Sequence, residues 1–264
     1  MIPLRPIALE CQHLCKTYHT RNATVPALED TTFSARGQEF LCIVGPSGCG
    51  KTTLLKLIAG LLQPTSGRIN YNAEPADGRP RNALVFQEHG LFPWMTVLDN
   101  VAFGLEMQGV ARQERHIQAR GFIERVGLAS FADSYPHELS VGMRQRVGIA
   151  RAFVADPQML LMDEPFGSLD AQTKLVLQGE LLRIWEDHQK LVIYVTHDIE
   201  EAVLLGDRVL VMTGRPGRVR EEIPIPLARP RDLSNIGRPD ITEIIWHIWK
   251  TVEDEVRRSL WIPA

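Results

Sequence analysis

Short, almost wholly apolar runs alternate along the chain with segments in which apolar residues recur every three or four positions. The clearest runs are residues 39–44, 82–86, 158–163, 191–197 and 208–213. Runs of this length predict buried strands, and the segments between them predict helices that cover both faces of a sheet. Strands that alternate with helices predict an α/β fold with a mostly parallel sheet.

Two segments depart from this alternation. From about residue 92 to residue 155, apolar residues recur at helical spacing and strand signals are few, which predicts an inserted helical subdomain. The last predicted helix has one apolar stripe, made of Ile241, Ile244, Ile245, Ile248, Val252 and Val256. Acidic residues dilute the rest of its surface, so we expect this helix to pack on the protein rather than on a membrane.

Bulk composition narrows the class of protein. The chain has 264 residues, of which 44% are apolar, and its net charge is -3, so we expect no nucleic-acid partner. No apolar run approaches the ~18 residues that a membrane span needs, and the first residues lack a signal-peptide pattern, so we expect a cytosolic protein. No second ligand pair at zinc spacing accompanies the cysteines, which predicts reduced thiols at Cys11, Cys15, Cys42 and Cys49.

A glycine-rich loop follows the first apolar run. Residues 45–52, GPSGCGKT, match the pattern G-x-x-x-x-G-K-[ST] without a gap. Such a loop wraps phosphates with backbone N–H groups and a helix N-terminus. Lys51 would bring a positive charge to the β- and γ-phosphates, and the Thr52 hydroxyl would bind Mg²⁺. The expected nucleotide contacts are Gly45, Pro46, Ser47, Gly48, Cys49, Gly50, Lys51, Thr52 and Thr53.

Polar side chains follow three other predicted strands. Asp163 and Glu164 end one strand, and His197 and Gln87 each follow another. Ligands bind at the carboxyl ends of strands in open α/β sheets, so we expect these groups beside the phosphate loop. Asp163 would hold Mg²⁺, and Glu164 would polarise an attacking water. Gln87 could reach Mg²⁺ or that water, and His197 could donate to the γ-phosphate or orient the water.

The order of the motifs resembles that of the ATP-binding subunits of ABC transporters, over about residues 7–226. Residues 139–146, LSVGMRQR, place a serine and a glycine at a predicted helix start and resemble the family's signature. The other matching motifs are Tyr18 in KTYHT, the phosphate loop as Walker A, Gln87 as the Q-loop, LLMDEP as Walker B, GSLD at 167–170 as the D-loop and His197 as the switch histidine.

This resemblance implies a fold and an assembly. The fold would be a P-loop NTPase core with a mostly parallel sheet, an N-terminal antiparallel β subdomain and an inserted helical subdomain. Residues 1–235 would form the ATPase domain, with helices inserted at about 92–155, and residues 236–264 a C-terminal helical tail. Two copies would pair head to tail around ATP, with Tyr18 stacked on adenine and with Ser140 and Gly142 at the γ-phosphate of the partner's ATP.

The segment FQEHGLFPWMTVLDNVAFGLEMQG resembles the nitrate, sulfonate and taurine importer subgroup. The resemblance implies an ATPase at the cytoplasmic face of the membrane, held there peripherally by integral-membrane permease subunits. Phe92, Pro93 and Trp94 lie where a permease would dock, and a periplasmic or lipoprotein substrate-binding protein would act indirectly. Because this subunit does not touch the transported substrate, the sequence does not identify that substrate.

Two positions depart from the family's usual LSGGQ, since Val141 and Met143 replace a glycine and the glutamine. Valine would be strained at a positive φ but costs only a few tenths of a kcal/mol in a helix, and we expect the helical case.

Two alternatives to the importer function remain, a soluble non-transport ABC ATPase and a regulatory ATP-binding subunit. The chain has no room for the long coiled coil or second cassette of the first, and intact Lys51, Asp163, Glu164 and His197 argue against the second.

Overall fold

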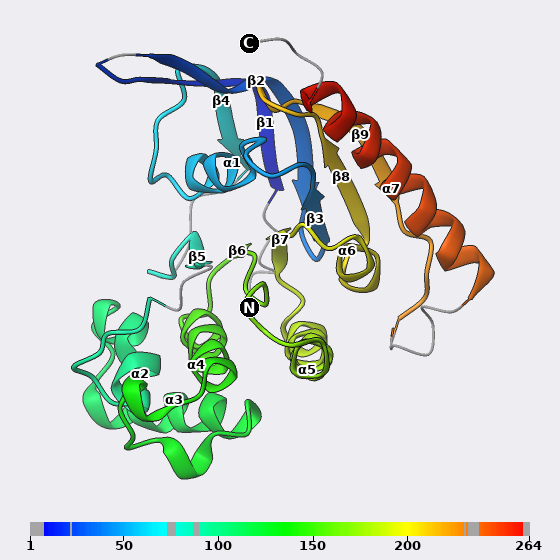
Figure 1. Ribbon diagram of the computed structural model, residues 1–264. Helices are drawn as coiled ribbons and strands as arrows, with labels where there is room; N and C mark the ends of the chain where they lie inside the picture. The colour runs from blue at the N-terminus through cyan, green and yellow to red at the C-terminus, as the bar shows by residue number, and fades with distance from the viewer. Residues whose placement is uncertain are drawn as a thin grey trace. The chain divides into compact units, whose positions relative to one another are not determined.

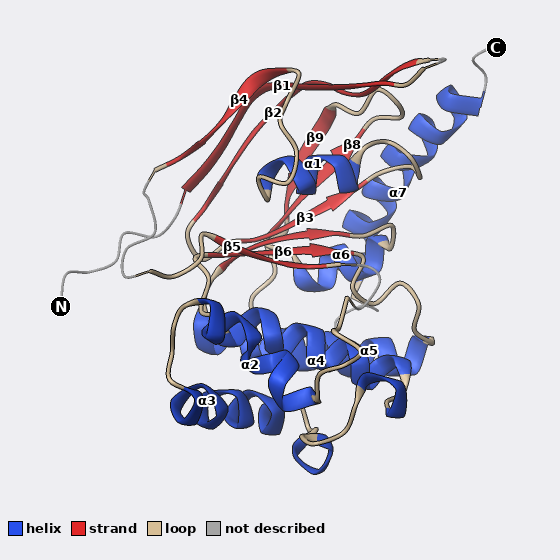
Figure 2. Ribbon diagram, turned by 90° about the vertical axis from the view of Figure 1, so that its left-hand side faces the viewer, coloured by secondary structure: helices blue, strands red, loops and turns tan. Residues whose placement is uncertain are grey.

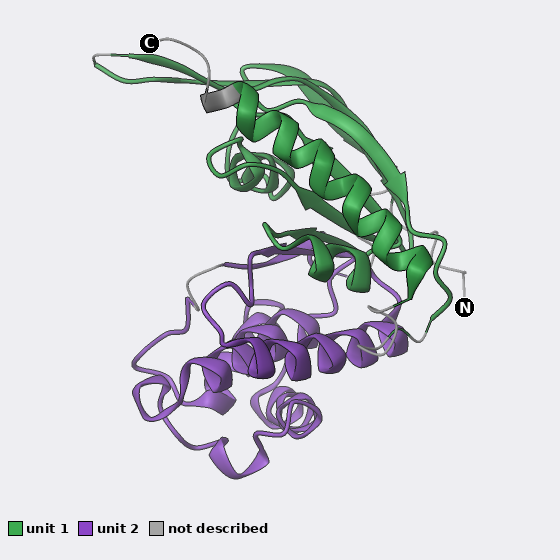
Figure 3. Ribbon diagram, turned by 45° about the vertical axis from the view of Figure 1, so that its right-hand side comes forward, with its two compact units in different colours: residues 1–73, 191–264 green, residues 74–190 purple. Residues whose placement is uncertain are grey.

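The computed structural model describes residues 8–21, 23–72, 78–86, 90–229, 231 and 238–260 (Figure 1). The chain divides into two compact units, one formed by residues 1–73 and 191–264 and the other by residues 74–190 (Figure 3). We refer to them as unit 1 and unit 2.

Unit 1 contains a sheet in which three neighbouring strands run parallel. The strands lie in the order β7 (Leu191–Val195), β3 (Phe40–Val44), β8 (Arg208–Met212) and β9 (Val219–Pro224), and only β9 is antiparallel to its neighbour. Every residue of β3 and β7 is buried. Burial on both faces is why these strands appear in the sequence as continuous apolar runs rather than as alternating patterns.

A second sheet of unit 1 is antiparallel, as the sequence analysis predicted. It joins β2 (Thr24–Arg36), β1 (Ala8–His19) and β4 (Ser66–Tyr71) in that order. Helix α1 (Lys51–Ile58) contacts β2 on one side and β7 on the other. Figure 2 shows this helix between the two sheets. The phosphate loop therefore leads from the parallel sheet into a helix that both sheets enclose.

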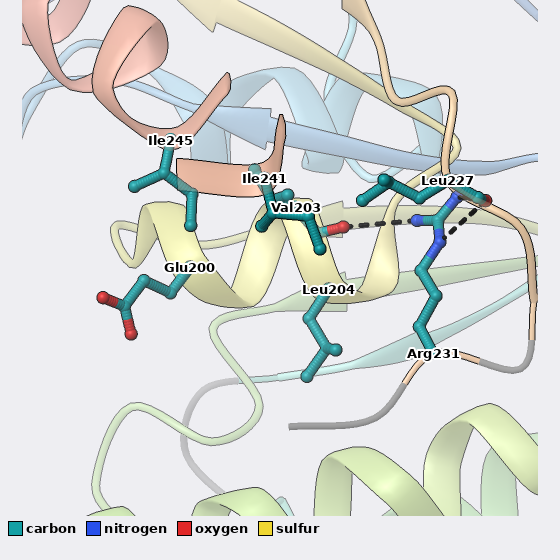
Figure 4. A pocket seen from close by; sticks show the side chains of 7 residues that line it. All are labelled: Glu200, Val203, Leu204, Leu227, Arg231, Ile241 and Ile245. Atoms are coloured by element: carbon teal, nitrogen blue, oxygen red, sulfur yellow. Dashed lines mark hydrogen bonds between the residues drawn. The ribbon is translucent and has the colours of Figure 1, made fainter. Parts of the chain in front are cut away.

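Helices α6 (Ile199–Leu205) and α7 (Pro239–Leu260) complete unit 1. The buried residues Ile241 and Ile248 belong to the predicted apolar stripe, and α7 contacts α6 and β8. Figure 4 shows Ile241 and Ile245 of α7 beside Val203 of α6, with the Arg231 guanidinium donating to the carbonyl of Val203 at 3.2 Å. Burial lowers the pKa of Arg231 to about 10. The C-terminal helix thus packs on the protein.

Unit 2 is mainly helical. Its two strands, β5 (Asn82–Val85) and β6 (Met159–Asp163), are parallel. The segment 92–155 holds helices and short 3-10 turns and no strand, as its periodicity predicted. These elements and the helix that follows β6 are α2 (Val97–Met107), α3 (Arg112–Arg125), η1 (Ala129–Phe131), η2 (Pro136–Glu138), α4 (Val141–Val154) and α5 (Ala171–His188). Across the described ranges, no helix is long and apolar enough to cross a bilayer.

Candidate functional site

The phosphate loop connects β3 to α1 in unit 1 and depends on glycine. Gly48 and Gly50 have φ values of 75° and 106°, a region that residues with a Cβ rarely occupy. A Cβ on Gly50 would also lie 2.8 Å from the carbonyl oxygen of Ala27. Gly50 is the N-cap of α1 and no side chain caps that helix, so its first N–H groups are left to other acceptors. A helix start of this kind suits an anion.

Lys51 lies buried across the loop that it follows. Its Nζ donates to the carbonyl oxygens of Gly45 at 2.8 Å and Pro46 at 3.1 Å. The Cys49 sulfur lies 3.9 Å from the same nitrogen. Burial raises the pKa of the Cys49 thiol, although the Lys51 side chain beside it acts in the opposite direction. Cys49 and the other three cysteines are free thiols, as predicted.

The turn between β8 and β9, residues 213–218, supports the phosphate loop from behind. A Cβ on Gly217 would lie 2.0 Å from the carbonyl oxygen of Cys49, and a Cβ on Gly45 would lie 3.0 Å from the carbonyl oxygen of Met212. Gly217 donates to Ala27 at 2.9 Å, and its carbonyl accepts from the buried Thr31 hydroxyl at 3.1 Å. Sequence reasoning missed this support, for which the Pro216-Gly217 pair was the available signal.

The side chain of Tyr18, a residue of β1, contacts the first turn of α1. Its hydroxyl is 3.3 Å from the Thr53 hydroxyl, and the Lys16 ammonium lies 5.4 Å from the centre of its ring. The structure thus brings Tyr18 together with the last residue of the predicted phosphate-binding set. Stacking of Tyr18 on adenine stays a prediction.

His197 leaves the sheet at the same edge as the phosphate loop. Strands β3 and β7 are parallel neighbours, with Ile43 opposite Val195, and Thr196 N donates to the Ile43 carbonyl at 3.1 Å. The loop and His197 are therefore the continuations of adjacent strands. The His197 side chain is exposed at that edge.

A buried carboxylate shapes the turn that carries His197. Glu201 accepts hydrogen bonds from the hydroxyls of Tyr194, at 2.8 Å, and Thr196. Thr196 accepts in turn from Asp198 N at 3.0 Å, and Asp198 caps α6. Burial, together with the carboxylate of Glu201, raises the pKa of Tyr194 well above its usual value. Sequence analysis did not single out Tyr194 or Glu201, because each looks like an ordinary strand or helix residue.

Asp163 and Glu164 lie in unit 2, at the carboxyl end of β6. Asp163 is buried, and Val85 of β5 is opposite the preceding Met162, so the two strands end at one edge. Glu164 has a φ of 45°, a left-handed conformation that costs a non-glycine residue about 1 to 2 kcal/mol. Its carbonyl accepts from Gly167 N at 3.1 Å, which closes a turn around it. Gln87 lies outside the described residues.

The signature segment begins helix α4 of unit 2. Ser140 is the exposed N-cap, and its Oγ accepts from Met143 N at 3.3 Å. Val141 is the first helical residue and does not have a positive φ, which confirms the helical expectation. A Cβ on Gly142 would lie 3.2 Å from the Thr173 methyl of α5, so this glycine also allows two helices of the unit to approach closely.

Gln145 connects α4 to the segment that carries Glu164. Its Nε2 donates to the carbonyl of Pro165, while its buried Oε1 has no hydrogen-bond partner among the described residues. Sequence reasoning missed this residue, because a glutamine beside arginines on a helix is usually solvated. The connection places the signature helix and the turn after β6 in direct contact.

Hydrogen bonds from one buried side chain hold the backbone of the loop before α2. The fully buried Asn100 donates to the carbonyls of Phe92, Met95 and Thr96 at 2.9 to 3.1 Å, and its Oδ1 accepts from Phe92 N at 2.8 Å. The Phe92 ring packs 4.6 Å from the Phe103 ring, measured between centroids. Trp94 is 70% exposed on this rigid loop, and Pro93 is exposed beside it.

Comparison with known proteins gives consistent results. The ABC transporter family model matches residues 28–167. An uncharacterized ABC transporter ATP-binding protein of Methanocaldococcus jannaschii is 47% identical over 255 residues, which cover 96% of this chain and 94% of the relative. A nitrate import ATP-binding protein of Synechocystis is 46% identical, with 83% of each chain covered. A taurine import ATP-binding protein of Burkholderia thailandensis is 46% identical and covers 83% of this chain and 85% of its own.

Solved structures are similar over most of the chain. The dimeric structure of a bacterial ABC transporter cassette has a TM-score of 0.73 and 31% identity, and covers 83% of this chain and all of its own. The dimeric post-hydrolysis state of an ATP-binding cassette bound to ADP and Pi has the same scores.

Proposed function

Because this chain belongs to the ABC transporter family and is an ATP-hydrolysing, nucleotide-binding importer subunit, we propose that two copies bind ATP head to tail between them. Each ATP would lie between the phosphate loop of one copy and Ser140 of the other. The observation that carries this proposal is the exposed hydroxyl of Ser140 at the start of α4. A serine hydroxyl and free helix N–H groups suit the γ-phosphate of a second molecule's nucleotide.

Within one copy, the phosphate loop and Lys51 would bind the phosphates. Two of the three N–H groups of Lys51 donate to loop carbonyls and would turn to phosphate oxygens when ATP arrives. Thr52 and Asp163 would hold Mg²⁺, which keeps phosphate and water ligands and needs only one or two protein groups. The donors fit, since one is a hydroxyl and the other a carboxylate. When bound, Mg²⁺ neutralises charge on the β- and γ-phosphates.

Glu164 would accept a proton from the water that attacks the γ-phosphorus, while the bond from that phosphorus to the bridging oxygen breaks and ADP leaves. His197 would donate from its imidazole N–H to the γ-phosphate or orient the water. Gln87 would orient the same water or reach the metal. The turns after β6 and β7 support the roles of Glu164 and His197, because hydrogen bonds hold the backbone of both.

We further propose that Phe92, Pro93 and Trp94 dock a membrane permease, which would hold this subunit at the cytoplasmic face of the membrane. A rigid loop with an exposed tryptophan suits an interface anchor. The nitrate and taurine import relatives favour nitrate, a sulfonate, taurine or a similar small anion as cargo. We propose that a separate binding protein delivers it. Trp94→Ala should reduce copurification with the permease, whereas Met107→Ala, at a residue 66% exposed, should not.

The central test uses Glu164→Gln. This variant should bind ATP, lose hydrolysis by about 100-fold or more, and accumulate as an ATP-bound dimer. Size-exclusion chromatography with light scattering, with and without ATP and Mg²⁺, measures the dimer. Full turnover by the variant would remove Glu164 from its role. A monomer with ATP bound would contradict the shared site.

A further inference from the structure

We propose that Glu255 of α7 is a positioning residue for nucleotide binding, because it holds the β8–β9 turn against the phosphate loop. The turn comprises residues 213–218. All of the contacts involved lie within unit 1. The inference rests on the proposed role of the phosphate loop in binding ATP, and it gives the C-terminal helix a function beyond packing.

Glu255 is a buried carboxylate, 5% exposed, with three donors. One oxygen accepts from Gly214 N at 3.1 Å. The other accepts from the guanidinium groups of Arg220 and, at 3.2 Å, Arg258. A buried charge needs such partners, and hydrogen bonds to a charged group are stronger than neutral ones. Glu255 therefore fixes the backbone of the turn at Gly214.

Hydrogen bonds within the turn link its residues to one another. Thr213 N donates to the Arg218 carbonyl at 2.9 Å, and the Thr213 hydroxyl accepts from Arg218 N at 2.9 Å and donates to the Pro216 carbonyl at 3.1 Å. These bonds span the turn from its first residue to its last. A shift imposed at Gly214 is therefore passed on to Gly217.

The far side of the turn contacts the phosphate loop through backbone. Gly217 fits against the Cys49 carbonyl with no space for a Cβ, and a Cβ on Gly45 would lie 3.0 Å from the Met212 carbonyl oxygen, which is also a tight contact. A Cβ placed on Gly48 would lie 3.5 Å from the Arg215 guanidinium. Because no flexible side chain separates Gly217 from Cys49, displacement of the turn must move the loop that binds phosphate. Glu255 thus acts on ATP through the turn without touching it.

Other contacts of α7 provide a matched control, because they reach β9 but not the turn. Thr251 is 7% exposed, and its hydroxyl donates to the His247 carbonyl at 3.0 Å and to Glu221 at 3.4 Å. Thr251→Val removes these bonds at nearly constant volume, one helical turn before Glu255. It tests whether α7 packing in general, rather than the contact with Gly214, affects the nucleotide.

The experiment measures ATP hydrolysis and the Kd for ATP with Mg²⁺ in the purified full-length chain. Glu255→Ala should raise KM and Kd about tenfold and leave kcat within about twofold, because the loop binds the ground state and the transition state alike. Glu255→Gln keeps an acceptor for Gly214 but loses its charge, so we expect an increase of about threefold. Thr251→Val should stay within about twofold of the wild type.

An unchanged Kd in Glu255→Ala would overturn the proposal, as would an equal increase in Thr251→Val. If Glu255→Ala does not fold, as judged by circular dichroism, Glu255→Gln decides, and an unchanged Kd in that variant has the same meaning. Lys51→Met separates the proposed function from this inference. If Lys51→Met weakens ATP binding while Glu255→Ala keeps the wild-type Kd, the proposed function stands and the inference about Glu255 is refuted.

Discussion

Two helices begin at residues that we assign to ATP, and they begin in different ways. Helix α1 starts after Gly50, which has a φ of 106° and supplies no side-chain cap. Helix α4 starts after Ser140, which is extended at φ -64° and ψ 166° and caps the helix with its own hydroxyl. The N-terminal end of each helix carries a partial positive charge that suits an anion. Only in α4 does a side chain accept a hydrogen bond from an N–H group of the first turn.

Their surroundings explain the difference. The α1 start is partly enclosed, since Cys49 and Lys51 are buried and Ala27 blocks any Cβ on Gly50, whereas Gly48 and Thr52 are exposed. The α4 start is exposed, both at Ser140 and at Val141. A phosphate site that is built from backbone packed against its neighbours therefore tolerates few residue types at its glycines. An exposed site that serves another molecule's nucleotide depends on one hydroxyl, which can leave its cap when the ligand arrives.

The largest expected effect is at the enclosed start. Lys51→Met removes the ammonium while keeping a long apolar side chain, and we expect ATP hydrolysis to fall by about 100-fold or more, roughly 2.7 kcal/mol of barrier. Lys56→Met, on the same helix and half-buried, is the matched control and should retain full activity. Phosphate release at saturating ATP measures both. More than a tenth of wild-type activity in Lys51→Met would mean that backbone N–H groups suffice.

At the exposed start, two substitutions of Ser140 separate capping from ligand binding. Serine to alanine at an N-cap costs about 1 kcal/mol of stability, whereas glycine costs only a few tenths. If the hydroxyl also binds the partner's ATP, Ser140→Ala and Ser140→Gly should both lose hydrolysis by about tenfold. In urea unfolding, Ser140→Ala should lose clearly more stability than Ser140→Gly. An active Ser140→Gly would reduce the hydroxyl to a helix cap.

Sequence pattern was sufficient for much of this molecule, for local reasons. The wholly buried strands β3, β6 and β7 are continuous apolar runs. The predicted site residues lie directly at or after the end of each run in the sequence. The phosphate loop is likewise one short segment. Val141 was predicted as helical because the first position of a helix accepts β-branched residues at small cost. Each of these inferences needed only a few consecutive residues.

Contacts between distant residues could not be found in this way. Gly217 supports Cys49, Glu201 holds the turn before His197, and Glu255 binds Gly214. A periodic pattern reports which face of an element is buried but not which partner lies against that face. Glu255, for example, appears in the sequence among acidic residues of an ordinary amphipathic helix. Its burial arises from Arg220 and the turn, which no local pattern of α7 contains.

The smallest expected effect concerns Val141, where the comparison of the two helix starts is tested most directly. Val141 is helical and 38% exposed, so glycine there should lower stability by a few tenths of a kcal/mol and leave hydrolysis within about twofold. Val176→Gly, at a residue 56% exposed in α5, controls for the cost of glycine in a helix. A steady-state ATPase assay and urea unfolding of both variants give these values.

A rise in hydrolysis of roughly tenfold in Val141→Gly, about 1.4 kcal/mol of barrier, would change the interpretation of α4. It would show that the partner's phosphate needs close backbone approach at this position, as the phosphate loop needs at Gly50. Both helix starts would then require a residue without a Cβ, and Val141 would lower the hydrolysis rate of the native enzyme. An unchanged rate supports the view that the Ser140 hydroxyl and the helix end are sufficient.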